Sequence, residues 1–168
     1  MPVIRAVPAQ AAMPFSLGVV ASETGDDLNR TVAFAREQGM VDLEVDAVWG
    51  TPVSEADDDL LARARDVIAD AELRVSMIGA PTFKTLIVKD ADPDDLPSIP
   101  GWEAQRMGLE GSFRAAKALN CRQVRVFSCR RDEMLDLGNP SPRYTDGGVL
   151  PPERLQALGA VLTDAARR

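Results

Sequence analysis

The sequence contains no histidine among its 168 residues. Histidine is the commonest metal ligand in proteins and the usual proton acceptor near neutral pH. Its absence therefore excludes every mechanism in which a residue of this chain acts as an imidazole base or as an imidazole metal ligand.

Long apolar runs are also missing. No stretch approaches the roughly 20 apolar residues that a helix needs to cross a bilayer, and residues 1–14 lack the apolar centre of a secretory signal. We expect a cytoplasmic protein with no membrane partner. Residues 1–14 carry no clear pattern, and we expect them to form a disordered lead.

Only two cysteines occur, Cys121 and Cys129. They lie at the start and just beyond the end of an expected strand, which would separate them by roughly 26 Å in extended backbone. We therefore expect no disulfide between them.

Positive charge is scarce relative to negative charge, with 19 Lys and Arg against 26 Asp and Glu and a net charge of -7. Nucleic acid binding depends on clustered Lys and Arg that neutralise phosphates. We therefore expect no nucleic acid partner. The hydrophobic content of 45% is enough for one ordinary globular core, so we expect a single domain.

Four short apolar runs alternate with helical patterns along the chain. Buried strands are predicted at residues 15–20, 41–45, 73–78 and 123–127. Helices are predicted to begin at Asp27, near Ser54, near Glu103 and at residues 151–152, the first ending at Gly39 and the third at Asn120. Inward-facing positions are expected to include Met107, Phe113, Leu155, Leu158, Val161 and Leu162.

The stretch from 82 to 102 contains three prolines and four aspartates and has little periodicity. We expect it to be a long excursion outside the core, of the kind that often carries function.

Strict alternation of strands and helices predicts the α/β class with a parallel sheet. Two architectures satisfy it: a small open doubly wound sheet, or the first four units of an eight-unit barrel. The length favours the open sheet. No Gly-rich phosphate turn follows the first strand, and this favours the parallel (β/α)4 half of a TIM barrel, truncated before strand 5.

Four segments carry a resemblance to a known family. They are residues 15–20, 39–50 (GMVDLEVDAVWG), 73–84 (LRVSMIGAPTFK) and 115–128 (AAKALNCRQVRVFS). In order and spacing they resemble the first four units of the xylose isomerase-like TIM barrels, specifically the sugar phosphate isomerase/epimerase group. On this resemblance, residues 15–168 form the N-terminal half of such a barrel.

The resemblance implies metal-dependent isomerisation or epimerisation of a sugar or related polyol. In that family, carboxylates and a histidine on strands five to eight hold a divalent metal, which polarises the substrate carbonyl. Those strands are missing from these 168 residues. We therefore assign no catalytic residue and no metal ligand, and expect the isolated chain to be inactive.

Two charged residues on expected strands are candidate substrate contacts. Glu44 lies near the carboxyl end of the second strand, with Asp46 two positions on and on the same face. Arg125 lies inside the fourth strand, where arginine is seldom buried unless it is paired. Arg125 either binds ligand or forms a structural ion pair with Glu44.

Lys84 and Trp49 complete the candidate site for a sugar or sugar phosphate. Lys84 follows the third strand and would meet an anionic ligand as a point charge, or be a solvated loop residue. Trp49 would form an apolar wall for a sugar ring, or pack on the top layer of the barrel. Ser128, Arg130 and Arg131 follow the fourth strand, on the same side or in a charged surface loop.

Three functional alternatives follow from the half-barrel. In the first, the missing C-terminal half or a second copy completes the enzyme, because a four-unit half leaves open sheet edges. In the second, the chain is a non-catalytic sugar-binding or half-barrel module that assembles as a homodimer. An endonuclease-like role, known among relatives of this barrel, is disfavoured by the acidic charge.

Overall fold

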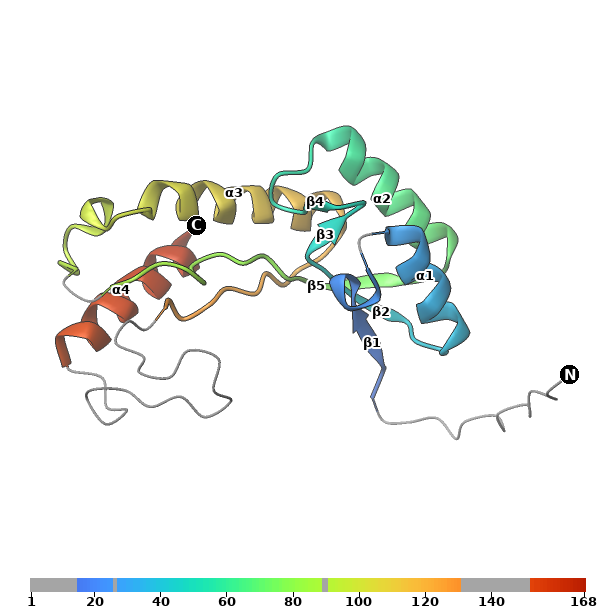
Figure 1. Ribbon diagram of the computed structural model, residues 1–168, viewed down its shortest axis with the longest axis horizontal. Helices are drawn as coiled ribbons and strands as arrows, with labels where there is room; N and C mark the ends of the chain where they lie inside the picture. The colour runs from blue at the N-terminus through green and yellow to red at the C-terminus, as the bar shows by residue number, and fades with distance from the viewer. Residues whose placement is uncertain (1–14, 26, 89–90, 131–151) are drawn as a thin grey trace, which may run out of the picture.

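The structure is a computed structural model that describes residues 15–25, 27–88, 91–130 and 152–168 (Figure 1). The expected disordered lead at residues 1–14 and the candidate Arg131 lie outside the described residues. No helix in the described ranges is both long enough and apolar enough to cross a membrane.

Three short strands form a parallel sheet in the order β1-β2-β5. They are β1 (Gly18–Val20), β2 (Asp42–Val45) and β5 (Arg74–Ile78). Val19 lies opposite Leu43, and Leu43 lies opposite Val75. This arrangement confirms the α/β class and the parallel sheet that the alternating pattern predicts; the described residues form no closed barrel.

The expected fourth strand is present only as a single parallel bridge between Ile78 and Val124. Beyond it, the segment 121–130 follows residues 79–88 side by side (Figure 1). The Phe127 amide donates to the Thr82 carbonyl and the Arg130 amide to the Leu86 carbonyl, at 2.9 and 2.7 Å. Between these two hydrogen bonds the segment 121–130 advances three residues, from Phe127 to Arg130, whereas its partner advances four, from Thr82 to Leu86. A regular strand ladder therefore does not form.

A hairpin that the sequence does not reveal follows β2. The strands β3 (Ala47–Val48) and β4 (Thr51–Pro52) pair antiparallel. Trp49 and Gly50 form the turn, with φ of 46° and 78°. Two positive φ angles are typical of the tight turn whose twist suits a hairpin, and a tryptophan seldom occupies such a position.

The described residues contain four α-helices: α1 (Leu28–Glu37), α2 (Asp58–Asp70), α3 (Trp102–Ala118) and α4 (Pro152–Arg167). The 3-10 turns η1 (Ala21–Thr24) and η2 (Leu96–Ser98) lie in the connections. Asp27 caps α1 as expected. The prediction that helix two begins near Ser54 is wrong. Asp57 caps α2 by accepting the Leu60 amide at 2.8 Å, and the helix begins at Asp58, four residues after Ser54.

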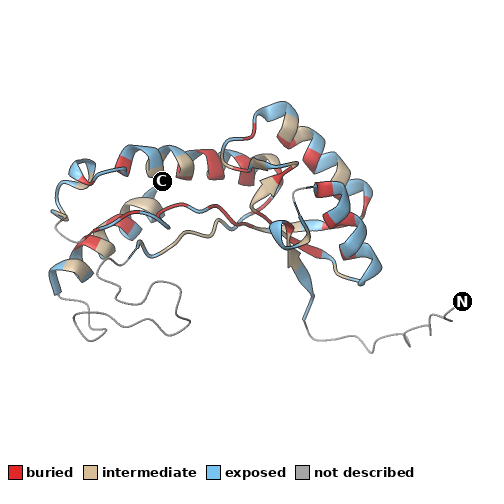
Figure 2. Cartoon of the chain, in the orientation of Figure 1, coloured by how far each residue is buried: buried red, intermediate tan, exposed pale blue. Residues whose placement is uncertain are grey.

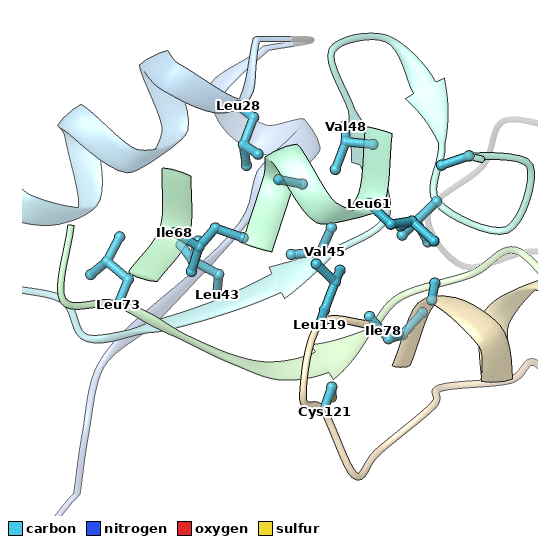
Figure 3. Close-up of a cluster of buried hydrophobic side chains, with 14 of the residues drawn as sticks. Leu28, Leu43, Val45, Val48, Leu61, Ile68, Leu73, Ile78, Leu119 and Cys121 are labelled. Carbon is cyan, nitrogen blue, oxygen red and sulfur yellow. The ribbon is translucent and has the colours of Figure 1, made fainter. Parts of the chain in front are cut away.

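The main hydrophobic core lies between the sheet and the helices α1 and α2 (Figure 3). Leu43, Val45 and Ile78 from the strands are fully buried there against side chains such as Leu28 and Leu61. Figure 2 shows buried positions on the helix sides that face the strands and exposed positions on the outer sides.

A second core joins α3, α4 and the stretch that the sequence presents as an excursion. Phe83 is buried in it and stacks on Trp102 with ring centroids 6.0 Å apart. Leu86 and Ile99 are buried as well, so the expectation that 82–102 stays outside the core is wrong. These apolar residues are too widely spaced to give a helix or strand pattern.

Several helix positions expected to face inward do not. Met107 and Leu155 are 61% and 52% exposed, and Leu162 is 36% exposed, whereas Val161 is fully buried. Small residues provide the close packing instead. Gly111 of α3 lies so near the Ser54 carbonyl that an added Cβ would come within 2.0 Å of its oxygen.

Candidate functional site

Glu44 and Arg125 form an ion pair across the sheet. The Arg125 Nε and Nη2 atoms both donate to Glu44 Oε1, at 2.8 and 2.6 Å. The side chains are 20% and 38% exposed, so the pair lies at the edge of the interior rather than in the core. The pairing considered for Arg125 from the sequence is therefore present. Glu44 Oε2 accepts no hydrogen bond from the described residues.

Gly79 makes room for this pair, a role that was not predicted from the sequence. A Cβ at this position would lie 2.4 Å from Glu44 Oε1 and 3.1 Å from Arg125 Nη2. The Gly79 amide also donates to the Val45 carbonyl at 2.9 Å, which extends the strand pairing by one residue. A glycine directly after a strand is the signal that could have indicated this close approach.

A pocket of about 250 Å³ opens beside the ion pair. It lies beyond the carboxyl ends of β2 and β5, the edge at which parallel α/β sheets bind ligands. Its lining includes Asp46, Gly79, Pro81, Lys84, Arg125 and Phe127.

Two cations approach one aromatic ring at the pocket. The Lys84 ammonium lies 5.4 Å and the Arg125 guanidinium 4.9 Å from the centroid of Phe127. Contacts of this kind hold a cation weakly and leave its hydrogen-bond donors available. Within the described parts of the chain, Lys84 forms no ion pair with a carboxylate.

Asp46 brings a carboxylate to the same pocket. Its Oδ1 accepts the Ser22 amide at 3.1 Å, so η1 holds this side chain in place. The pocket therefore presents both acceptors and donors. This combination suits the hydroxyl groups of a polyol together with one anionic group.

Trp49 is not part of this pocket. Its ring packs against the main core, with the Arg63 guanidinium 4.1 Å from the ring centroid. The indole Nε1 is buried without a hydrogen-bond partner among the described residues. The structure thus brings Glu44, Lys84 and Arg125 together and places Trp49 against α2. Ser128 and Arg130 are exposed further along the segment.

The divalent metal that the family resemblance implies does not fit these residues. Arg125 already neutralises Glu44, and the Ser22 amide occupies an oxygen of Asp46. No group of three or more Cys, Asp or Glu side chains placed to hold a metal occurs in the described ranges. No catalytic step is therefore routed through a metal at this pocket.

Comparison with family models, with curated proteins and with solved structures gives no match for this chain.

Proposed function

We propose that this chain binds a sugar or sugar phosphate at the carboxyl edge of its parallel sheet, as the ligand-binding part of a sugar phosphate isomerase/epimerase-like protein. The observation that carries the proposal is the pocket beside the Glu44–Arg125 pair, with the Lys84 ammonium at its lining. The resemblance to the xylose isomerase-like barrels supplies the reaction class.

Each polar group has a role in ligand binding. Lys84 meets the phosphate as a point charge. Arg125 directs donors at a ligand oxygen while Glu44 holds its guanidinium in place. The free Oε2 of Glu44 accepts from a hydroxyl. A volume of about 250 Å³ is slightly below the range of drug-sized sites, which suits a pentose or hexose phosphate.

In this proposal the divalent metal of the family would be held by strands five to eight of a complete barrel, which these 168 residues do not supply. That metal would polarise the sugar carbonyl when bound. The described residues bind and orient the substrate, and none of them is assigned as a catalytic residue. The proposal therefore predicts that the isolated chain binds the sugar phosphate but does not isomerise it.

A homodimer of half-barrels is the second candidate. It is favoured by backbone groups of Val124 that are unpaired within the described residues, at the edge of the sheet beyond β5. The Ile78 amide donates to Gln123 O and the Arg125 amide donates to Ile78 O, at 2.9 and 2.8 Å. The N–H and C=O of Val124, which lies between them, therefore point away from β5. They have no hydrogen-bond partner in the described part of the chain. Such an edge can accept another strand.

Calorimetry tests the ligand. Wild-type protein is titrated with glucose 6-phosphate, ribose 5-phosphate and the unphosphorylated sugars, and compared with Lys84→Gln. We expect binding of a sugar phosphate that weakens about tenfold in Lys84→Gln, the loss of one charge-assisted contact. Arg36→Gln, which removes an exposed cation on α1, is the matched control. The absence of heat with every ligand from a folded wild type would refute the proposal.

Light scattering coupled to gel filtration tests the homodimer. A dimer that becomes monomeric when Val124 is replaced by proline supports edge pairing, because proline lacks the outward N–H. A folded wild-type monomer at all concentrations would refute it and leave the ligand proposal standing.

A further inference from the structure

An apolar groove lies where the two cores meet, away from the pocket at the carboxyl edge. It has a volume of about 600 Å³ and runs between α3, α4 and residues 121–126. Ala116, Cys121 and Val124 on one side belong to the main core, and Leu109, Phe113 and Val126 on the other belong to the second core. The gap exists because these two clusters do not merge.

The groove exposes apolar surface that neither core covers. Phe113, Val124 and Val126 are only partly buried, and Leu162 on the α4 wall is 36% exposed. A hollow with such walls favours an apolar occupant, because each methylene removed from water contributes free energy. Its size lies within the range of small-molecule sites.

Two cations on the groove lining have no partner among the residues that the structure describes. Lys117 in the last turn of α3 and Arg122 just after it are exposed, and neither forms an ion pair or side-chain hydrogen bond with the described part of the chain. Arg168, the third cation on the lining, is held by Asp164 at 2.8 Å. None of the described residues that line the groove is a carboxylate, although the chain as a whole carries a net charge of -7. The local charge is therefore opposite to the overall charge.

We infer that this groove binds an amphiphilic carboxylate, with its apolar chain on Phe113, Val126 and Leu162 and its carboxylate at Lys117 and Arg122. An amphipathic helix fits less well. Two turns of helix about 11 Å across occupy roughly 1000 Å³, more than the groove holds. This inference does not depend on the proposed sugar site, which lies at a different pocket.

Titration calorimetry with octanoate tests the inference at pH 7.5. We expect one octanoate per chain and at least tenfold weaker binding of octan-1-ol, which has the same chain without the charge. Hexanoate is expected to bind about fourfold more weakly per methylene removed. The double variant Lys117→Gln/Arg122→Gln should lose at least tenfold in octanoate affinity.

Two further variants complete the design. Leu162→Gln removes one apolar wall from an exposed position and should weaken octanoate while leaving the fold unchanged by circular dichroism. Arg36→Gln removes a cation elsewhere and should bind octanoate as the wild type does. The inference is wrong if octanoate gives no heat, if octanol binds equally well, or if the double variant binds unchanged.

Discussion

Glu44 and Arg125 lie 81 residues apart in the sequence, and two hydrogen bonds join them over the bare backbone of Gly79. The carboxylate on β2 thereby fixes the guanidinium that lines the pocket. Because Glu44 lies on β2 and Arg125 lies on the segment on the other side of β5, the pair links the two neighbours of β5.

A double-mutant cycle on Glu44→Gln and Arg125→Gln should give a coupling free energy of about 1–2 kcal/mol, between the values for exposed and buried ion pairs. Urea unfolding of the four proteins at pH 7 measures it. The Arg65–Asp66 pair on α2, in which both side chains are exposed, serves as the control and should couple less strongly. Zero coupling between Glu44 and Arg125 would mean that the pair does not hold the site.

Gly111 in α3 and Gly159 in α4 should respond oppositely to alanine. Gly111→Ala should destabilise the protein by about 3 kcal/mol, because the new methyl meets the Ser54 backbone, which cannot rotate away. Gly159→Ala meets no atom within 4 Å and should stabilise by up to about 1 kcal/mol through helix propensity. Thermal unfolding measures both. Equal effects would contradict the close packing of α3 on the Ser54 turn.

Asp42 should make stability depend on acid pH. The hydrogen bond from Arg74 lowers the pKa of Asp42 below its ordinary 3.8, against the opposing effect of burial. A lowered folded-state pKa contributes stability above the unfolded value that is lost as the pH falls through the folded one. Asp42→Asn should thus be about 1 kcal/mol less stable than wild type at pH 7. This difference should shrink below pH 4, as measured by urea unfolding; a constant difference would exclude this linkage.

Cys129 should react slowly with thiol reagents. Burial raises the pKa of its thiol to about 11. At pH 8 the thiolate fraction is then about 100-fold below that of an ordinary cysteine. Rates with a disulfide reagent are measured in Cys121→Ser, so that only Cys129 reports, and compared with the urea-unfolded chain. A rate in the folded protein equal to that of free cysteine would contradict the half-buried placement of this thiol.

The sequence predicted the helix ends that are set by one residue and its immediate neighbours. Asp27 at the start of α1 and Asn120 after α3, with φ of 54°, were readable because caps follow from the residue and its neighbours. The regular strand expected at 123–127 did not form, since its ladder depends on the partner segment at 79–88.

Part of the candidate site was also predictable, because some of its residues stand out by type and position in the sequence alone. Glu44 and Lys84 were identifiable as charges at the expected carboxyl edge, and Arg125 as an arginine inside an expected buried strand. The displacement of Trp49 toward Arg63 depends on a positive φ of 46° that its residue type does not suggest. The need for glycine at position 79 depends on two side chains from distant segments.

The most direct test of the sugar phosphate site is the nuclear magnetic resonance signal of the Arg125 Nε–H, observed while ribose 5-phosphate or glucose 6-phosphate is added. Its hydrogen bond to Glu44 Oε1 should slow its exchange with water and make it observable. We predict that this signal and the Gly79 amide shift together as the ligand saturates, while the Gly159 amide stays unchanged. Saturable shifts confined to other parts of the chain, or none at all, would contradict the assignment of the ligand to this pocket.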